Sequence, residues 1–202
     1  MRLLKKLGLA AVIAAAAAAY AAPTASAVES TTLCWIGTET TCPESKRVTA
    51  MAIEAEDPVF LSTLGNVLCE LAFFALAPEP GTAPEVIHVV GSQWHECTLA
   101  GGPCAVKDLA FEHLDLQRTQ YNLGTVTWLG HEAEIACTGF TCKYGGKFTL
   151  QAEGANHTAG ANFGMVTANG TPIAKIGGAF FCPKEVKLHA LFEFELGAFI
   201  TY

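Results

Sequence analysis

Short runs of alternating hydrophobic and polar residues fill most of the chain after its first fifty residues. The pattern is clearest near the C-terminus, where Val186, Leu188, Ala190, Phe192 and Phe194 occupy every second position. Successive side chains of a β-strand point to opposite faces, so these five residues would share one face. No window longer than about ten residues has a clean helical period. The pattern therefore predicts an all-β protein.

Glycine, proline and asparagine separate these runs, for example at Gly145-Gly146 and Asn169-Gly170, and such pairs are typical of turns. The predicted strands are 48–56, 59–63, 66–76, 85–90, 106–116, 125–129, 133–138, 147–152, 165–168 and 186–196. Many short strands with regular turns favour a single-domain two-sheet sandwich, with a closed β-barrel as the alternative.

Two segments fit a strand less well. The apolar run VLCELAFFALA, residues 67–77, is also compatible with a short buried helix. DLAFEHLDLQR, residues 108–118, loses its alternation between His113 and Leu114, which indicates a bulge or a turn of helix there.

The N-terminus has the three-part layout of a secretory signal peptide. Three cationic residues precede the uncharged stretch 7–22, and the small-residue triplet Ala25-Ser26-Ala27 follows it. We expect cleavage after Ala27, leaving one disulfide-bonded domain, residues 28–202, to be secreted. A membrane anchor fits less well, because the apolar stretch is shorter than the ~20 residues that span a bilayer.

Loss of the leader would make the protein more acidic. The full chain of 202 residues has a net charge of −7, and removing Arg2, Lys5 and Lys6 would bring it to −10. This balance argues against nucleic acid and anionic membrane surfaces as partners.

All eight cysteines follow the predicted leader, and an even number in an exported chain indicates disulfides. A zinc site is disfavoured, because the close pairs that zinc requires are missing from their spacing. Three local pairs bracket turn-like stretches, and a turn brings its ends within disulfide distance. The prediction is thus Cys34–Cys42, Cys97–Cys104 and Cys137–Cys142, which leaves Cys69 for Cys182 by elimination, although eight cysteines allow 105 connectivities.

The cysteine frame resembles that of a group of exported proteins of unknown function from soil actinobacteria. The resemblance lies in TTLC, the Cys42-Pro43 pair, STLGNVLCE, CTLAGGPCAVKDL, EIACTGFTCKYG and GGAFFCPKEVK, and it covers essentially the whole chain after the leader. It implies a bacterial, secreted, disulfide-bonded β protein and no particular chemistry. The chain departs from the group at Leu188, where an aromatic residue is expected.

Catalytic motifs are not evident. The segment GHEAEI begins like a zinc-protease helix, but position 135 is Ile where the second histidine would stand. Acid–base pairs are conceivable at His95 with Glu96 and at His113 with Asp115, although exposed polar side chains explain both equally well. The sequence therefore predicts no catalytic, cofactor or metal site.

The three tryptophans are the candidate binding residues. Trp35, Trp94 and Trp128 each lie near a glycine or a cysteine, where loops emerge, and exposed tryptophans commonly anchor sugars and proteins. Packing on a disulfide is the alternative role. We expect an exported, non-catalytic protein that binds an extracellular or cell-surface ligand. A carboxylate-dependent hydrolase and a small-molecule carrier are the alternatives.

Overall fold

The protein is all-β, as its hydrophobic pattern predicts. The computed structural model describes residues 31–35, 42–79, 84–155, 164–194 and 198–201, so the predicted leader lies outside the described residues. Within these ranges the helical structure is one 3₁₀ turn, Glu44–Lys46. No helix in the described part of the chain is long and apolar enough to cross a membrane.

Fourteen strands make up the described fold. Their bounds are β1 Thr32–Cys34, β2 Met51–Glu56, β3 Val59–Leu61, β4 Val67–Leu68, β5 Leu71–Glu79, β6 Glu85–His95, β7 Thr98–Leu99, β8 Gly102–Ala110, β9 His113–Gln120, β10 Leu123–Cys137, β11 Phe140–Glu153, β12 Met165–Gly178, β13 Glu185–Phe194 and β14 Phe199–Thr201. Residues 67–77, for which the sequence also allowed a short helix, form β4 and most of β5. The break between β8 and β9 falls at Phe111-Glu112, close to where the alternation fails.

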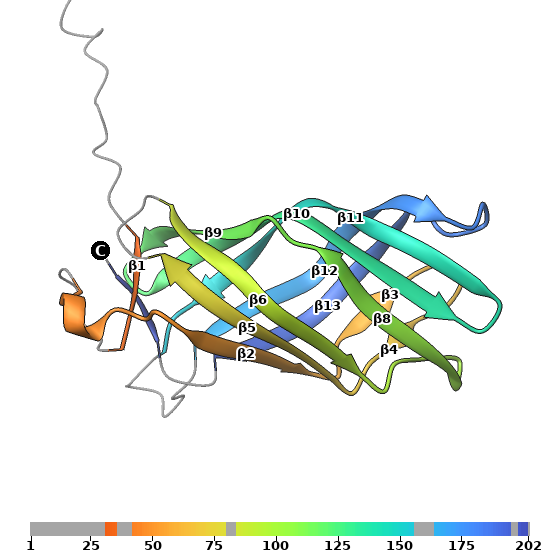
Figure 1. The fold of residues 1–202 in the computed structure, drawn as a ribbon, viewed down its shortest axis with the longest axis horizontal. Helices are drawn as coiled ribbons and strands as arrows, with labels where there is room; N and C mark the ends of the chain where they lie inside the picture. The colour runs from red at the N-terminus through yellow and green to blue at the C-terminus, as the bar shows by residue number, and fades with distance from the viewer. Residues whose placement is uncertain (1–30, 36–41, 80–83, 156–163, 195–197, 202) are drawn as a thin grey trace, which may run out of the picture.

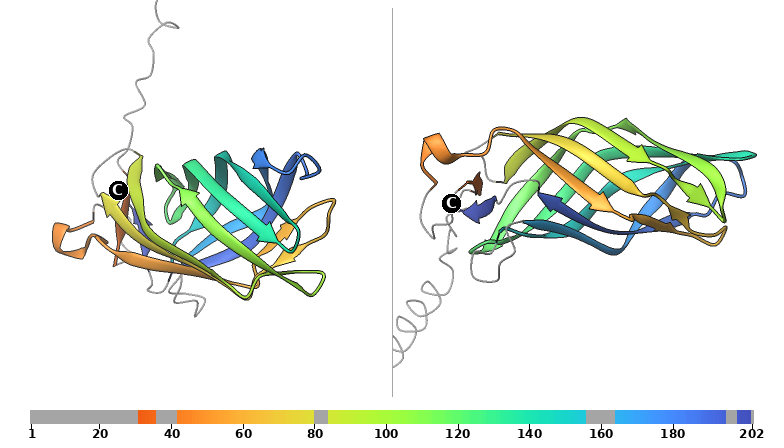
Figure 2. Two further views of the ribbon diagram at one scale, coloured as in Figure 1. Left: turned by 45° about the vertical axis from the view of Figure 1, so that its right-hand side comes forward. Right: turned by 90° about the horizontal axis from the view of Figure 1, so that it is seen from below.

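Twelve strands form one large sheet in the order β11-β12-β13-β2-β5-β6-β9-β10-β8-β7-β4-β3. The sheet folds over the core, so that β2, β5 and β6 cross the front of the molecule while β12 and β13 cross behind them (Figure 1). This sandwich-like packing of two layers matches the expected fold class. The layers are also joined by hydrogen bonds, because β10 pairs with β11 and β13 pairs with β3 (Figure 2).

Aromatic rings fill the centre between the layers. Phe74 makes edge-to-face contacts with Trp94, Phe111, Trp128 and Phe192, at ring-centre distances of 5.3 to 6.1 Å. Such contacts add to the free energy gained by burying the rings. β13 contributes as expected, because Val186, Leu188, Phe192 and Phe194 are buried and Ala190 is half-buried.

Several predicted turns are wrong, because the chain continues through them as bulged strands. β11 runs through Gly145-Gly146, and β12 runs through Asn169-Gly170 with a register shift between Asn169 and Thr171. β10 likewise joins two predicted strands across a shift between Trp128 and His131. Glycine at a positive φ, such as Gly170 at +69°, occurs in β-bulges as well as in turns. The sequence alone therefore did not distinguish a bulge from a turn at these positions.

All eight cysteines form disulfides, but three of the four predicted pairings are wrong. The bridges are Cys34–Cys42, as expected, and Cys69–Cys97, Cys104–Cys137 and Cys142–Cys182. The β-ladders explain the difference, since Cys104 lies directly opposite Cys137 where β8 pairs with β10. Cys142 lies opposite Ile135 rather than Cys137, because the β10–β11 turn is only two residues long.

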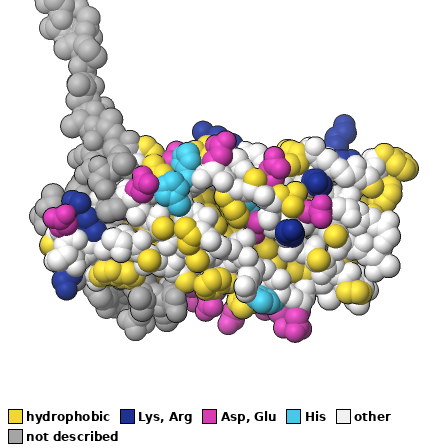
Figure 3. All heavy atoms as spheres, viewed as in Figure 1, with side chains coloured by type: hydrophobic (Ala, Val, Ile, Leu, Met, Phe, Trp, Pro, Cys, Tyr) yellow, Lys and Arg dark blue, Asp and Glu magenta, His cyan; other side chains and the backbone are white. Residues whose placement is uncertain are grey.

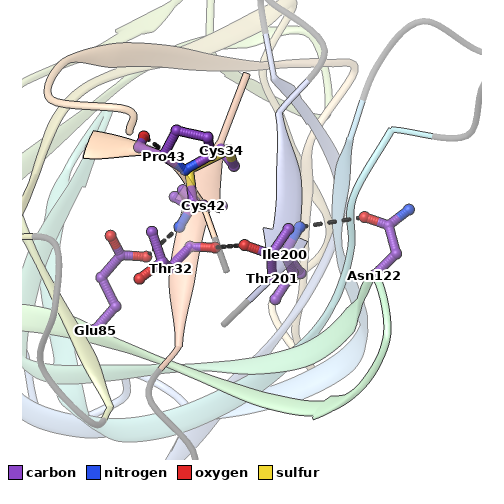
Figure 4. Close-up of a disulfide and its surroundings, with 9 residues drawn as sticks. Thr32, Cys34, Cys42, Pro43, Glu85, Asn122, Ile200 and Thr201 are labelled. Carbon is purple, nitrogen blue, oxygen red and sulfur yellow. Dashed lines mark hydrogen bonds between the residues drawn. A yellow bond between two sulfur atoms is a disulfide. The ribbon is translucent and has the colours of Figure 1, made fainter. Parts of the chain in front are cut away.

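A small two-stranded sheet of β1 and β14 lies at the end of the molecule where the described chain begins and ends (Figure 1). The Asn122 side chain accepts a hydrogen bond from the Ile200 N–H at 3.2 Å. The buried Glu85 carboxyl group accepts one from the Leu33 N–H at 2.8 Å, close to the Cys34–Cys42 bridge (Figure 4). These contacts hold both terminal strands to the large sheet.

Candidate functional site

The tryptophans have structural positions rather than exposed ones. Trp128 is only 3% exposed and stacks on Phe148 in the core, so a ligand at the surface cannot contact it. Trp94 is half-buried, and its Nε1–H donates to Asp108 at 2.8 Å. Trp35 is half-buried against the core, and its backbone N–H donates to the Lys46 carbonyl.

Asp108 and His131 form a buried pair behind Trp94. The Asp108 carboxylate accepts from Trp94 through one oxygen and lies 2.9 Å from His131 Nε2 through the other. The two side chains are 1% and 5% exposed. His131 Nδ1 is also buried, so neither ring nitrogen is accessible to a substrate. The pair ties β8, β10 and β6 together beside an open pocket of about 270 Å³ between β6 and β8.

The histidine–carboxylate pairs considered from the sequence differ in geometry. His113 Nε2 lies 3.2 Å from Asp115, with both side chains roughly one-third exposed. His95 instead contacts Gln93, at 3.2 Å, and is exposed. Neither contact includes a nucleophilic side chain beside the histidine.

Three glutamates line a groove of about 200 Å³ where β2 meets β13. Glu54 lies directly opposite Glu193, and Glu56 and Leu191 complete the lining. All three glutamates are exposed. A glycosidase also uses two carboxyl groups, but one of them usually lies in an apolar environment that keeps it protonated.

The strongest site lies at the opposite end of the molecule from β1 and β14, which we call the distal end. It comprises the stretches 62–66, 99–104, 137–142 and 176–184, and Lys184 is the one charged residue that they contain. Two disulfides join three of these stretches. A third, Cys69–Cys97, lies next to the pairing of β4 with β7. This end is therefore cross-linked and almost uncharged.

A small apolar pocket shows that the four stretches meet. Its lining includes Leu64, Leu99, Phe140 and Pro183, one residue from each stretch, together with the buried Tyr144. The volume of about 20 Å³ is enough for roughly one water molecule. Burial raises the pKa of the Tyr144 hydroxyl, so this group stays neutral.

Two phenylalanines stand at the surface of the distal end. Phe180 is 95% exposed and Phe181 is 45% exposed. Their rings pack edge to face at 5.3 Å, and Phe181 packs on Phe140 at 5.8 Å. We call these three residues the aromatic rim. Figure 3 shows hydrophobic side chains at this end of the visible face and no acidic ones.

The loop that carries the rim is held in place from several sides. Cys182 is bonded to Cys142, and the Ala179 N–H donates to the Thr141 carbonyl at 3.0 Å. The Lys175 ammonium group donates to the carbonyls of Ala179 and Cys182, at 2.7 and 3.5 Å. A loop that is ordered before binding loses less conformational entropy when it binds.

Sequence reasoning missed this rim because the two phenylalanines resemble part of a strand. A usable signal was present, since Phe180-Phe181 lies between Gly177-Gly178 and Cys182-Pro183, and apolar residues between turn-forming pairs have no regular face to bury. Comparisons with known proteins found no matching protein-family model, curated protein or solved structure.

Proposed function

We propose that this chain is an exported, non-catalytic binding protein that attaches to a ligand at or outside the cell surface through its distal end. The observation that carries the proposal is the 95% exposed Phe180 on a loop braced by a disulfide. A large apolar side chain at the surface is costly in water, and clusters of exposed apolar residues commonly mark binding sites.

Export is supported by the chemistry of the cysteines. Four disulfides and no free thiol are typical of proteins that fold in an oxidising compartment. The leader-like N-terminus supports the same conclusion.

Two observations make the alternatives weaker. A carrier generally needs a cavity of at least ~300 Å³ to enclose a small molecule, whereas the apolar pocket holds about 20 Å³ and the pocket of about 270 Å³ between β6 and β8 is open to solvent. A hydrolase has one observation in its favour, the glutamates Glu54 and Glu193 facing each other across the β2–β13 groove. Their exposure to solvent, however, leaves them without the apolar surroundings of a catalytic acid.

The binding proposal is tested with the double variant Phe180→Ser/Phe181→Ser. Fluorescently labelled protein is titrated onto intact cells of the organism that makes it, and saturable binding is measured. Burying one phenylalanine stabilises a complex by about 1.5 to 3 kcal/mol, so we expect at least a ten-fold loss of affinity.

Val90→Ser is the matched control, because Val90 is 68% exposed but lies on β6, beside the pocket between β6 and β8. This variant should bind as the wild type does. Equal binding by the rim variant would contradict the proposal. Hydrolysis of cell-wall polysaccharide that Glu54→Gln or Glu193→Gln abolishes would instead establish the hydrolase.

A further inference from the structure

We propose that the distal end docks on a membrane surface that carries anionic lipid headgroups. The aromatic rim would enter the interface between headgroups and acyl chains while neighbouring lysines contact the phosphates. This inference rests on the proposed function and names the ligand of the same site. It concerns a protein that lies on the membrane and does not cross it.

The distribution of acidic residues is the first argument. The chain has nineteen Asp and Glu residues, yet the four stretches of the distal end contain none. The acidic groove of Glu54, Glu56 and Glu193 lies elsewhere, on β2 and β13. The net negative charge of the whole chain therefore does not describe the surface that the distal end would present to a membrane.

Lysines beside the rim supply the charge complementarity. Lys184 lies in the rim loop and is exposed, Lys175 is hydrogen-bonded to that loop, and Lys143 follows Cys142 with a side chain that is 43% exposed. Glu185 follows Lys184 in the sequence, and Glu134 pairs with Lys143 at 3.5 Å. These three lysines and two glutamates sum to a charge of +1, on a chain whose net charge is −7.

The position of the rim also suits an extended planar surface. The connection between β12 and β13 lies, with the β10–β11 turn, at one end of the long axis of the molecule (Figure 1). A side chain that is 95% exposed at this end can contact a flat surface. Aromatic side chains with lysines close by are also found in the amphipathic helices that lie in a lipid interface.

The experiment is co-sedimentation of the purified, oxidised protein with vesicles. One set contains phosphatidylglycerol and phosphatidylcholine, and the other contains phosphatidylcholine alone. We expect stronger binding to the anionic vesicles. Phe180→Ser/Phe181→Ser should weaken that binding by at least about ten-fold, and Lys184→Glu by roughly 5- to 30-fold.

Two control variants match these changes at other places on the molecule. Val90→Ser removes an exposed apolar side chain from β6, and Lys46→Glu makes the same charge change in the 3₁₀ turn at the opposite end. Both should bind anionic vesicles as the wild type does. All variants share the same N-terminal segment, so any contribution of that segment to vesicle binding cancels in the comparison. Thermal unfolding checks that each variant is folded.

Three results would overturn the inference: no binding to anionic vesicles, equal binding to both vesicle types, or unchanged binding by the rim variant. Its failure is distinguishable from failure of the proposed function. If the rim variant loses binding to cells while the wild type does not bind vesicles, the ligand is a protein or polysaccharide and the proposed function stands. If cell binding is also unchanged, both are wrong.

Discussion

Glu85 shows how a buried environment changes the chemistry of one residue. Its carboxyl group is fully buried, and Oε1 has no hydrogen-bond partner among the described residues. Burial raises the pKa of Glu85 to about 8, although the hydrogen bond from Leu33 and the charge of Arg47 both lower it. Glu85 is therefore mostly protonated at neutral pH.

The pH dependence of stability follows from this pKa. The folded state keeps the Glu85 proton up to about pH 8, whereas the unfolded state loses it near the ordinary value of 4.5. Between these values the unfolded state binds fewer protons, so the contribution of Glu85 to the free energy of unfolding falls as pH rises. That contribution is complete below pH 4.5 and is lost by about pH 8.

Glu85→Gln should remove this dependence, because an amide keeps the acceptor oxygen for Leu33 and does not titrate. From pH 5 to pH 7.5 the wild type should lose on the order of 3 kcal/mol more unfolding free energy than the variant does. Urea unfolding followed by tryptophan fluorescence at both pH values measures the difference. The exposed Glu44→Gln is the control, and equal pH dependence in wild type and Glu85→Gln would show that the pKa of Glu85 is not raised.

At the scale of elements, the disulfides follow the β-ladders. Three of the four bridges connect strands or connections that are adjacent in the large sheet, and each closes a much longer loop than Cys34–Cys42 does. The sequence separations are 28, 33 and 40 residues, against 8 for Cys34–Cys42. In the chain-entropy model a longer loop restricts the unfolded state more.

The variant Cys142→Ser/Cys182→Ser should consequently be less stable than Cys34→Ser/Cys42→Ser. The model gives about 4 kcal/mol for the longer loop and about 2.5 for the shorter, a difference worth roughly 3 to 6 °C in melting temperature at this chain length. Differential scanning calorimetry of the two variants measures it. The first variant should also lose binding, because Cys182 holds the loop of the aromatic rim.

Peptide mapping without reduction provides the control for this comparison. It should recover Cys69 linked to Cys97, Cys104 to Cys137, and Cys142 to Cys182. A peptide that links Cys97 with Cys104 would mean that Cys104 is not bonded to Cys137, its partner in the β8–β10 pairing. The order of stability of the two variants would then have a different cause.

At the scale of the whole molecule, the two ends of the sheet have different roles. One end is occupied by β1, β14 and the contacts of Glu85, whereas the other presents loops without acidic residues and exposed aromatic rings. The bridges of the distal loops cross-link neighbouring strands and hold these loops to the sheet. Such a division between scaffold and loops is common in binding proteins.

The predicted N-terminal leader belongs to the same scale, because it would decide where the molecule works. Protein recovered from the culture medium should begin at Val28, since Ala25-x-Ala27 is the well-placed cleavage triplet. Edman sequencing or intact mass measures this directly. Protein that keeps Met1 and stays inside the cell would contradict the proposal that the chain is exported.

The sequence by itself determined the class of the fold and the state of its cysteines. Alternation is a local property of the backbone, so Val186, Leu188, Phe192 and Phe194 could be assigned to one buried face without knowing what covers it. The even number of cysteines likewise predicted that all would be bonded.

Only the tertiary structure decided which residues meet. Cys104 and Cys137 are 33 residues apart, and their bond depends on how β8 pairs with β10, which no local pattern specifies. The same holds for exposure, because strand neighbours bury Trp128 while a braced turn leaves Phe180 in solvent. Pairing between distant strands thus assembled the distal end and set its charge, since it brings together four loops without acidic residues from separate parts of the chain.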